Sequence, residues 1–433
     1  MSQRLAAPVQ DRPEPSAGAP PGPAAIGAPT QRVRVATRAT WALVVGLLVL
    51  YLVVFAAGAA GRLVRPNEEF VYGESWLLDD ARRVADGEGL YGPVDRLPLM
   101  HTAYTPVYYL LVGGLDRVLG DSGYTAGRWV SLLATLGGAL ALAWSVRRIS
   151  GRWRFGLLAG AFFLTQNLTV LLWAPLHRAD GLALAFTLTG LALATGGRPL
   201  AAALLFSLAV LTKQTFLVAP LALAVALWPC WRRLLGFGAL FGGVLLVAVG
   251  VAQWLSGGWF LWHTIIGNSN EAEFDTFAQL MGSFLQFNGM PVLAAAVSLA
   301  LPGYKAERPW RLYFLGSLAT LATITKIGAS SNYWLEITAA TAVMLALAAA
   351  KLTREPALQL VAPTVIAGAL FVSVPAYQAS AREAADGLRE AASTSPAYLS
   401  LVSDVSTAPF RVEAGFVKQI AAEPGELLTD NPG

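Results

Sequence analysis

Long apolar runs recur along the chain from about residue 41 to residue 376 and are separated by short polar segments. A helix needs about 20 mostly apolar residues to cross the hydrocarbon core of a bilayer. The pattern therefore predicts an all-α polytopic membrane domain over residues 32–376, with about eleven transmembrane helices. The predicted spans are residues 41–60, 127–146, 155–173, 181–196, 199–212, 214–230, 234–256, 289–303, 311–326, 333–350 and 357–376.

The segment before the first apolar run predicts the orientation. Residues 1–31 are rich in Pro, Ala and Gly, which is typical of a disordered tail. Arg32, Arg34 and Arg38 then precede the first span, and positive charges flanking a span favour the cytoplasmic side. We therefore expect a disordered cytoplasmic N-terminal tail and no signal peptide.

The run 104–115 decides how the rest of the chain threads the membrane. It is apolar but only about a dozen residues long, too few to span as a helix. We interpret it as a juxtamembrane helix on the outer surface. With this choice the later positive clusters all fall in cytoplasmic loops and the C-terminus lies outside. These clusters are Arg147, Arg148, Arg152 and Arg154; Arg198; Arg232 and Arg233; Lys305, Arg308 and Arg311; and Lys351 and Arg354.

Two regions outside the spans have recognisable patterns. Within the first outer loop, residues 62–126, the stretch 74–85 has helical spacing with an apolar stripe, and predicts an amphipathic interfacial helix. Residues 377–433 form a predicted soluble extracytoplasmic tail. A helical pattern at 411–421 followed by a strand-like piece at 426–430 indicates a short α/β segment that the chain begins but does not complete; a frayed terminus is the alternative.

Composition agrees with the membrane assignment. Hydrophobic residues make up 55% of the 433 residues and charged residues only 13%, against about 25% charged in average soluble domains. These values exclude a disordered chain, a coiled coil and a disulfide scaffold, and they disfavour a soluble enzyme. The net charge of +4 comes from clusters between apolar runs, so we expect no nucleic-acid partner.

Polar residues beside the spans gather on the predicted outer side. A charge close to the bilayer is costly, so each one is expected to have a partner or a function. His177, Arg178 and Asp180 lie between two spans, and Asp180 is alternatively a simple helix cap. Lys213, in Thr-Lys-Gln-Thr between apolar runs, is either a snorkelling lysine or a counter-ion for a phosphate. Lys326 also lies outside.

Glu336 lies a short way into the span that follows the segment 330–335. A carboxylate at that depth needs a partner, and we expect Lys326 or Lys213 to supply it. The three histidines are far apart, and no metal motif, nucleophile elbow, Walker loop or Rossmann fingerprint stands in a credible context. Use of a divalent cation stays open.

In order and spacing, these segments resemble the GT-C superfamily of polytopic glycosyltransferases, which use polyprenyl-phosphate sugars. The nearer relatives are the aminoarabinose transferases of lipid A, the protein O-mannosyltransferases and bacterial homologues. The resemblance covers about residues 41–350. It rests on an acidic first outer loop, the AxxxxxGxxLY pattern at 81–91, the YxPxYYLL pattern at 104–111, Arg-x-Asp at 178–180, Lys-Gln-Thr at 213–215 and Asn-Tyr-Trp-Leu-Glu at 332–336.

The resemblance implies an inverting transfer of sugar to an acceptor hydroxyl outside the bacterial plasma membrane. Glu74 is the implied base, although the Asp that often precedes it in the family is Gly73 here. Asp180 matches the second acidic position, and Lys213, Arg178 and Lys326 are expected on the donor phosphate. The other residues expected to bind substrate are Asp79, Asp80, Tyr104, His177, Gln214, Asn332, Tyr333 and Glu336.

The partners implied are a polyprenyl-phosphate-linked sugar, a lipid, glycan or protein acceptor, and the bilayer. Two alternatives remain at this point. A transporter or lipid flippase would also carry intramembrane charges, although it should place them near mid-membrane in repeated halves. A catalytically inactive homologue that acts as a scaffold would explain the missing Asp.

Overall fold

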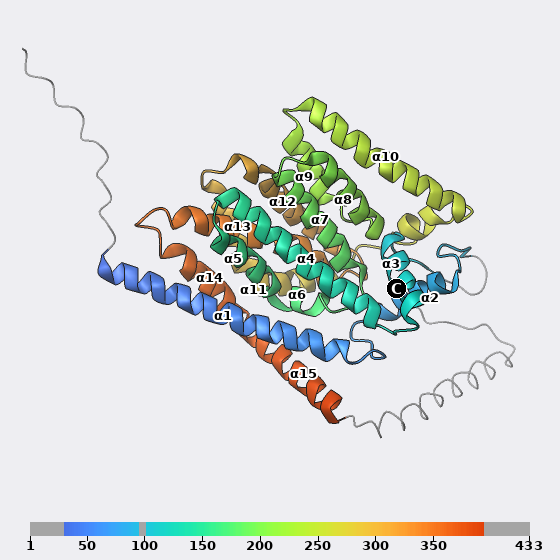
Figure 1. Cartoon of the computed structure of the whole chain (residues 1–433), viewed down its shortest axis with the longest axis horizontal. Helices are drawn as coiled ribbons and strands as arrows, with labels where there is room; N and C mark the ends of the chain where they lie inside the picture. The colour runs from blue at the N-terminus through green and yellow to red at the C-terminus, as the bar shows by residue number, and fades with distance from the viewer. Residues whose placement is uncertain (1–29, 95–100, 394–433) are drawn as a thin grey trace, which may run out of the picture.

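The computed structural model describes residues 30–94 and 101–393 (Figure 1). The described residues form helices and contain no β-sheet, only one isolated bridge between Ala272 and Lys326. The α-helices are α1 (Gln31–Leu63), α2 (Glu74–Asp86), α3 (Val107–Leu119), α4 (Thr125–Ser150), α5 (Trp153–Leu164), α6 (Asn167–Trp173), α7 (Ala179–Thr195), α8 (Pro199–Thr212), α9 (Val218–Leu227), α10 (Trp231–Leu255), α11 (Phe274–Val297), α12 (Arg308–Ala319), α13 (Leu335–Leu352), α14 (Val361–Val372) and α15 (Val374–Ser393).

The predicted helical membrane fold is confirmed. Among the described residues, five stretches are long and apolar enough to cross a bilayer: Gln31–Leu63, Thr125–Ser150, Trp231–Leu255, Phe274–Ala300 and Ser331–Leu352. Five more apolar helices have 10–17 residues: α5, α7, α8, α9 and α14. The count of eleven spans stays a prediction.

Several predicted boundaries differ from the observed ones, among them those of the spans at 155–173 and 289–303. The span predicted at 155–173 is two helices, because the chain breaks at Thr165 and Gln166 between α5 and α6. The span predicted at 289–303 is the second half of α11, which begins at Phe274. The sequence had placed residues 257–288 in an outer loop, but residues 274–288 are helical and Pro291 lies inside the same helix. Pro is tolerated within a membrane helix where neighbours satisfy the backbone.

Helix α13 forms the centre of the bundle. Fourteen consecutive residues, Ile337–Ala350, are buried, seven of them alanine. A helix that is apolar and buried on every side must be surrounded by other helices. It contacts α4, α5, α11, α12 and α14. By contrast α10, at the edge of the bundle in Figure 1, fully buries only Phe237, and its other apolar side chains are half-buried or exposed.

Small residues let α4 and α5 pack closely. Gly156 and Gly160 are four residues apart on one face of α5. A Cβ atom at Gly156 would lie 2.3 Å from the Ala143 carbonyl oxygen, and one at Gly160 would lie 2.9 Å from the Ala139 carbonyl oxygen. This small-xxx-small contact is a common way for membrane helices to associate.

Helices α2 and α3 lie together at one end of the bundle, away from the start of α1 (Figure 1). They cross closely at Gly113, where an added Cβ would lie 2.5 Å from the Ala81 carbonyl oxygen. Both helices contribute to an apolar cluster separate from the main core, which includes Tyr108, Tyr109 and Phe260. The run predicted as a juxtamembrane helix is thus a 13-residue helix paired with α2.

The start of the predicted C-terminal tail is helical. In α15, Tyr377 stacks on Tyr51 of α1 with ring centroids 3.7 Å apart, and its hydroxyl donates to the Thr165 carbonyl at 2.6 Å. Residues 377–393 therefore pack on the membrane domain. The helical pattern at 411–421 and the strand-like piece at 426–430 lie outside the described residues.

Candidate active site

Asp180 is the centre of a buried polar cluster formed by the ends of three elements. It lies in the first turn of α7, and its side chain is only 1% exposed. Its Oδ1 atom accepts hydrogen bonds from Lys213 Nζ at 2.6 Å and from Asn332 Nδ2 at 2.9 Å. Lys213 is the residue at which α8 ends, and Asn332 lies in the 3-10 turn before α13. Asp180 Oδ2 accepts no hydrogen bond from a described residue.

Burial lowers the pKa of Lys213, but the interactions with Asp180, Tyr104 and Tyr333 together outweigh burial, so the pKa lies above its usual value. The ammonium also lies 4.8 Å from the Tyr104 ring centroid and 5.8 Å from that of Tyr333. A buried ion pair of this kind is costly to break, because removing one partner leaves the other charge buried and unpaired. Lys213 is therefore a charged residue of the cluster and does not snorkel.

Arg178 forms the second side of the cluster. Its Nη2 donates to the Tyr104 hydroxyl at 3.2 Å, its Nε lies 3.9 Å from Asp180 Oδ2, and its guanidinium faces the Trp173 ring at 5.3 Å. Ser131 donates to the Arg178 carbonyl and helps to hold this loop against α4.

Lys326 lies near the cluster and is not part of its ion pair. Its ammonium donates to the Asn268 carbonyl. Burial lowers the pKa of Lys326, and the positive charge of Lys213 lowers it further. Lys326 thus adds a third cation beside Tyr104, one without a carboxylate partner among the described residues.

Glu74 is placed differently from Asp180. It lies at the start of α2, is fully buried and pairs with Arg128 of α4, whose Nε and Nη2 donate to its two oxygens at 3.1 and 3.0 Å. The backbone N–H groups of Phe70 and His177 also donate to it, at 2.9 and 2.6 Å. Both oxygens of Glu74 are therefore occupied by donors.

The space beside Gly73 is taken by Arg178. Gly73 has φ of +93°, and a Cβ atom there would lie 2.5 Å from Arg178 Nη1. The same guanidinium nitrogen donates to the Tyr72 carbonyl at 3.4 Å. An arginine thus fills the space next to the position where the resemblance leads one to expect an aspartate.

His177 and Gln214 each contact parts of the chain that are distant in sequence. The His177 ring is buried against Gly127, where a Cβ would lie 2.2 Å from Nδ1, and burial lowers its pKa to about 4. Gln214 Nε2 donates to the carbonyls of Ala103 and Thr264 at 2.9 and 2.8 Å, which ties the outer loops to the end of α8.

Neither Asp79 nor Asp80 forms a hydrogen bond or ion pair with Asp180, Lys213 or Arg178 in the described structure. Asp79 is exposed, whereas Asp80 is buried, accepts from Thr102 Oγ1 at 2.8 Å and pairs with Arg83 at 3.2 Å. Burial raises the pKa of Asp80 to about 7, although Thr102 and Arg83 oppose the shift. Asp80 therefore belongs to a contact within the outer loop.

Glu336 does not form the predicted ion pair. Among the described residues neither Lys213 nor Lys326 forms a salt bridge with it, because these bind Asp180 and the Asn268 carbonyl. The Oε1 atom of Glu336 is buried and has no described hydrogen-bond partner. The prediction failed because it assumed that the nearest outer lysine in sequence was free.

Arg128 is a residue near the candidate site that was not predicted from the sequence. It is the largest fully buried charged side chain described, and it also donates to the carbonyls of Arg62, Arg65 and Glu68. The signal was available, because an arginine at the outer end of a predicted span breaks the positive-inside rule just as Lys213 does.

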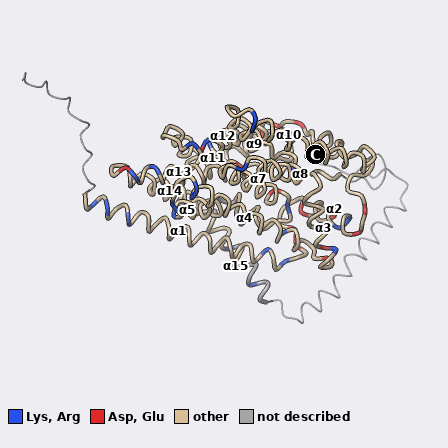
Figure 2. Tube along the Cα trace, turned by 45° about the horizontal axis from the view of Figure 1, so that its top comes forward, with Lys and Arg blue, Asp and Glu red and all other residues tan. Residues whose placement is uncertain are grey.

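The donor set suits an anion better than a divalent cation. No group of three or more His, Cys, Asp or Glu side chains comes together in the described ranges. Asp180 is flanked by Lys213 and Arg178, whose charges repel a metal ion and attract a phosphate. Figure 2 shows acidic and basic residues mixed around α2 and α3.

Comparison with known proteins identifies the fold. The sequence matches no protein-family model and no curated protein. The structure resembles the crystal structure of ArnT from Cupriavidus metallidurans bound to undecaprenyl phosphate, with a TM-score of 0.54, 18% identity, and coverage of 80% of this chain and 76% of that one. It resembles the apo form of ArnT with a TM-score of 0.54, 15% identity, and coverage of 79% and 77%. The chain therefore has the polytopic helical fold of ArnT.

Proposed function

We propose that this protein is a GT-C-type glycosyltransferase of the bacterial inner membrane that moves a sugar from a polyprenyl-phosphate donor to an acceptor hydroxyl on the outer side. The observation that carries the proposal is the cluster of Asp180 with Lys213, Arg178 and Asn332 at the ends of α7, α8 and the turn before α13. The ArnT structure, which holds undecaprenyl phosphate, supports a lipid phosphate as the ligand.

The cations supply the charge that this reaction needs. When the bond between the anomeric carbon and the phosphate oxygen breaks, negative charge develops on the leaving polyprenyl phosphate. Preorganised cations in a buried site stabilise such charge more than water does. Lys213 and Arg178 take this role, with Lys326 beside them.

Asp180 is the better placed base in this arrangement. The acceptor oxygen attacks the anomeric carbon with inversion, the carbon–phosphate oxygen bond breaks, and the acceptor proton passes to Asp180 Oδ2, which accepts no hydrogen bond in the described structure. A donor phosphate that draws Lys213 toward itself would free the carboxylate to take this proton. Glu74, the base that the resemblance implied, has both oxygens occupied and would hold the loop 177–178 in place.

The position of the charges favours this function over transport. Asp180 lies in the first turn of α7, Lys213 follows the last residue of α8, and Glu336 is in the first turn of α13. A transporter is expected to hold its charges near mid-membrane in discontinuous helices. Charges at helix ends suit chemistry at the membrane surface.

The test is a transfer assay in proteoliposomes with donors labelled in the sugar. We expect labelled sugar to move from the donor to an acceptor in the extract and free polyprenyl phosphate to accumulate, and we expect Asp180→Asn to abolish both changes. Release of polyprenyl phosphate can be followed even while the acceptor is being sought in membrane extracts. Absence of release with a panel of polyprenyl-phosphate sugars and extracts would favour the inactive scaffold.

A further inference from the structure

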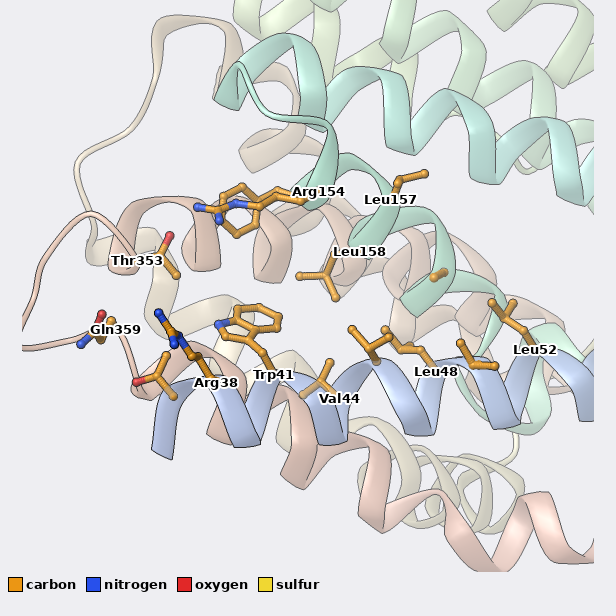
Figure 3. A pocket seen from close by; sticks show the side chains of 15 residues that line it. Arg38, Trp41, Val44, Leu48, Leu52, Arg154, Leu157, Leu158, Thr353 and Gln359 are labelled. Carbon is orange, nitrogen blue, oxygen red and sulfur yellow. The ribbon is translucent and has the colours of Figure 1, made fainter. Parts of the chain in front are cut away.

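A second site lies at the opposite end of α1 from the Asp180 cluster. A groove of about 720 Å³ runs between α1 and α5 and reaches the segment after α13 (Figure 3). Its walls are mainly aliphatic. Figure 3 shows Arg38, Arg154, Thr353 and Gln359 together at one end of the groove, and Leu48 and Leu52 toward the other.

The polar end of the groove has unused hydrogen-bonding capacity. Arg38 forms no hydrogen bond or ion pair with a described residue, and Arg154 contacts only the Phe155 ring, at 4.7 Å. The Nε2 atom of Gln359 is buried and has no partner among the described residues. Two exposed guanidinium groups thus flank a buried amide donor at one end of the groove. The buried Gln359 donor is costly to leave unpaired, and the two cations can be reached by an anion from the solvent or the headgroup region.

The apolar part of the groove has the length of one leaflet. From Trp41 to Leu52 the lining of α1 extends eleven residues, or about 17 Å at 1.5 Å per residue. Half of the hydrocarbon core of a bilayer is about 15 Å. Val45 and Val49 line the groove yet are 56% and 55% exposed, so a further apolar surface can be buried there.

We propose that this groove binds an anionic phospholipid of the leaflet that faces the start of α1. The headgroup phosphate lies between Arg38 and Arg154 and accepts from Gln359, and one acyl chain runs along Val45 and Leu48. Charge complementarity selects an anionic headgroup, because neither cation has a carboxylate partner in the described part of the chain. The one-leaflet length favours a fatty acyl chain over the much longer polyprenyl chain of the donor.

The test counts lipids bound to the purified full-length protein by native mass spectrometry. Phosphatidylglycerol and phosphatidylcholine with identical acyl chains are titrated in parallel. We expect the wild type to bind phosphatidylglycerol about tenfold or more tightly. Both lipids carry the phosphate, but the quaternary ammonium of phosphatidylcholine would lie beside two guanidinium groups that repel it. The double variant Arg38→Gln/Arg154→Gln should lose this preference.

Matched variants separate the groove from general charge and from misfolding. Arg152 is exposed at the same end of the molecule and does not line the groove, so Arg152→Gln should keep the preference. Val45→Trp obstructs the exposed wall and should weaken binding of both lipids while leaving the helical circular dichroism intact.

Three results would overturn the proposal: equal binding of the two lipids by the wild type, an equal loss in Arg152→Gln, or displacement of phosphatidylglycerol by equimolar undecaprenyl phosphate. The last result would assign the groove to a polyprenyl lipid. Sugar transfer plays no part in this experiment, so failure of the proposed function would leave the outcome unchanged.

Discussion

Nη1 of Arg178 occupies the space next to Gly73, only 2.5 Å from where a Cβ atom would stand. The left-handed backbone of Gly73, with φ of +93°, also disfavours any residue with a side chain. The two features belong together, because a side chain at position 73 would displace the guanidinium from Tyr104 and Asp180.

Gly73→Ala is therefore expected to act through Arg178. The substitution should cost about 1–2 kcal/mol of stability from the left-handed backbone alone. It should also raise KM for the polyprenyl-phosphate donor more than it lowers kcat. Donor titrations of the transfer rate measure this split, and Gly89→Ala, at a glycine with no neighbouring atom within 4 Å of an added Cβ, is the control. An unchanged KM would show that Arg178 does not bind the donor.

Glu74 and Arg128 are expected to stabilise the site. Glu74→Gln leaves Arg128 buried without its counter-charge, and breaking such a pair costs about 3–5 kcal/mol. We expect a large loss of thermal stability in detergent, and a partial recovery of it in Glu74→Gln/Arg128→Met. If Glu74→Gln instead kept wild-type stability and donor binding but abolished transfer, Glu74 would be the base and Asp180 would not.

Asp180 and Lys213 should also stabilise each other as a buried ion pair, and substitution of either should in addition change the transfer reaction. Asp180→Asn is expected to lower kcat by a factor of about 10² or more through loss of the base. Lys213→Met should weaken donor binding and also destabilise the protein, because Asp180 loses its closest cation. Comparison of donor affinity in the two single variants separates the roles. Equal effects on affinity and rate in both would contradict them.

The stability of the hydrogen bond between Thr102 and Asp80 of α2 should depend on pH. Burial raises the pKa of Asp80 to about 7, so its protonated form is favoured in the folded loop. The stabilisation is complete below the unfolded pKa of about 4 and is lost as pH rises through about 7. Burial lowers the pKa of the neighbouring His263, which therefore stays neutral near pH 7.

Hydrogen exchange of residues 101–104 measures this dependence. Protection should fall between pH 6 and pH 8 after correction for the intrinsic exchange rate, and Asp80→Asn should remove the fall. A wild-type protein with the same protection at both pH values would refute a raised pKa for Asp80.

The helical membrane fold could be predicted because run length and the placement of positive charge are local properties of a sequence. The start of α11 could not, because the polar residues before Asn288 favoured an outer loop, whereas the helix begins at Phe274 and runs through them. A sequence pattern gave no way to tell a span from two shorter helices at Thr165.

The site was predictable in part for a similar reason. Asp180 and Lys213 stood out as charges beside apolar runs, and the structure brings them to 2.6 Å. The partner of Glu74 is Arg128, 54 residues away on another helix, and such pairing follows from tertiary packing. That pairing distinguishes the two carboxylates. It occupies both oxygens of Glu74, whereas Asp180 Oδ2 accepts no hydrogen bond from a described residue.

The most direct test of the central claim measures undecaprenyl phosphate binding to the purified protein. Wild type, Lys213→Met and the groove variant Arg38→Gln/Arg154→Gln are titrated with the lipid under identical conditions. We predict saturable binding by the wild type, about tenfold or more weaker binding by Lys213→Met through loss of a charge-assisted contact, and unchanged binding by the groove variant. Equal affinity of wild type and Lys213→Met would contradict a donor phosphate site at the Asp180 cluster.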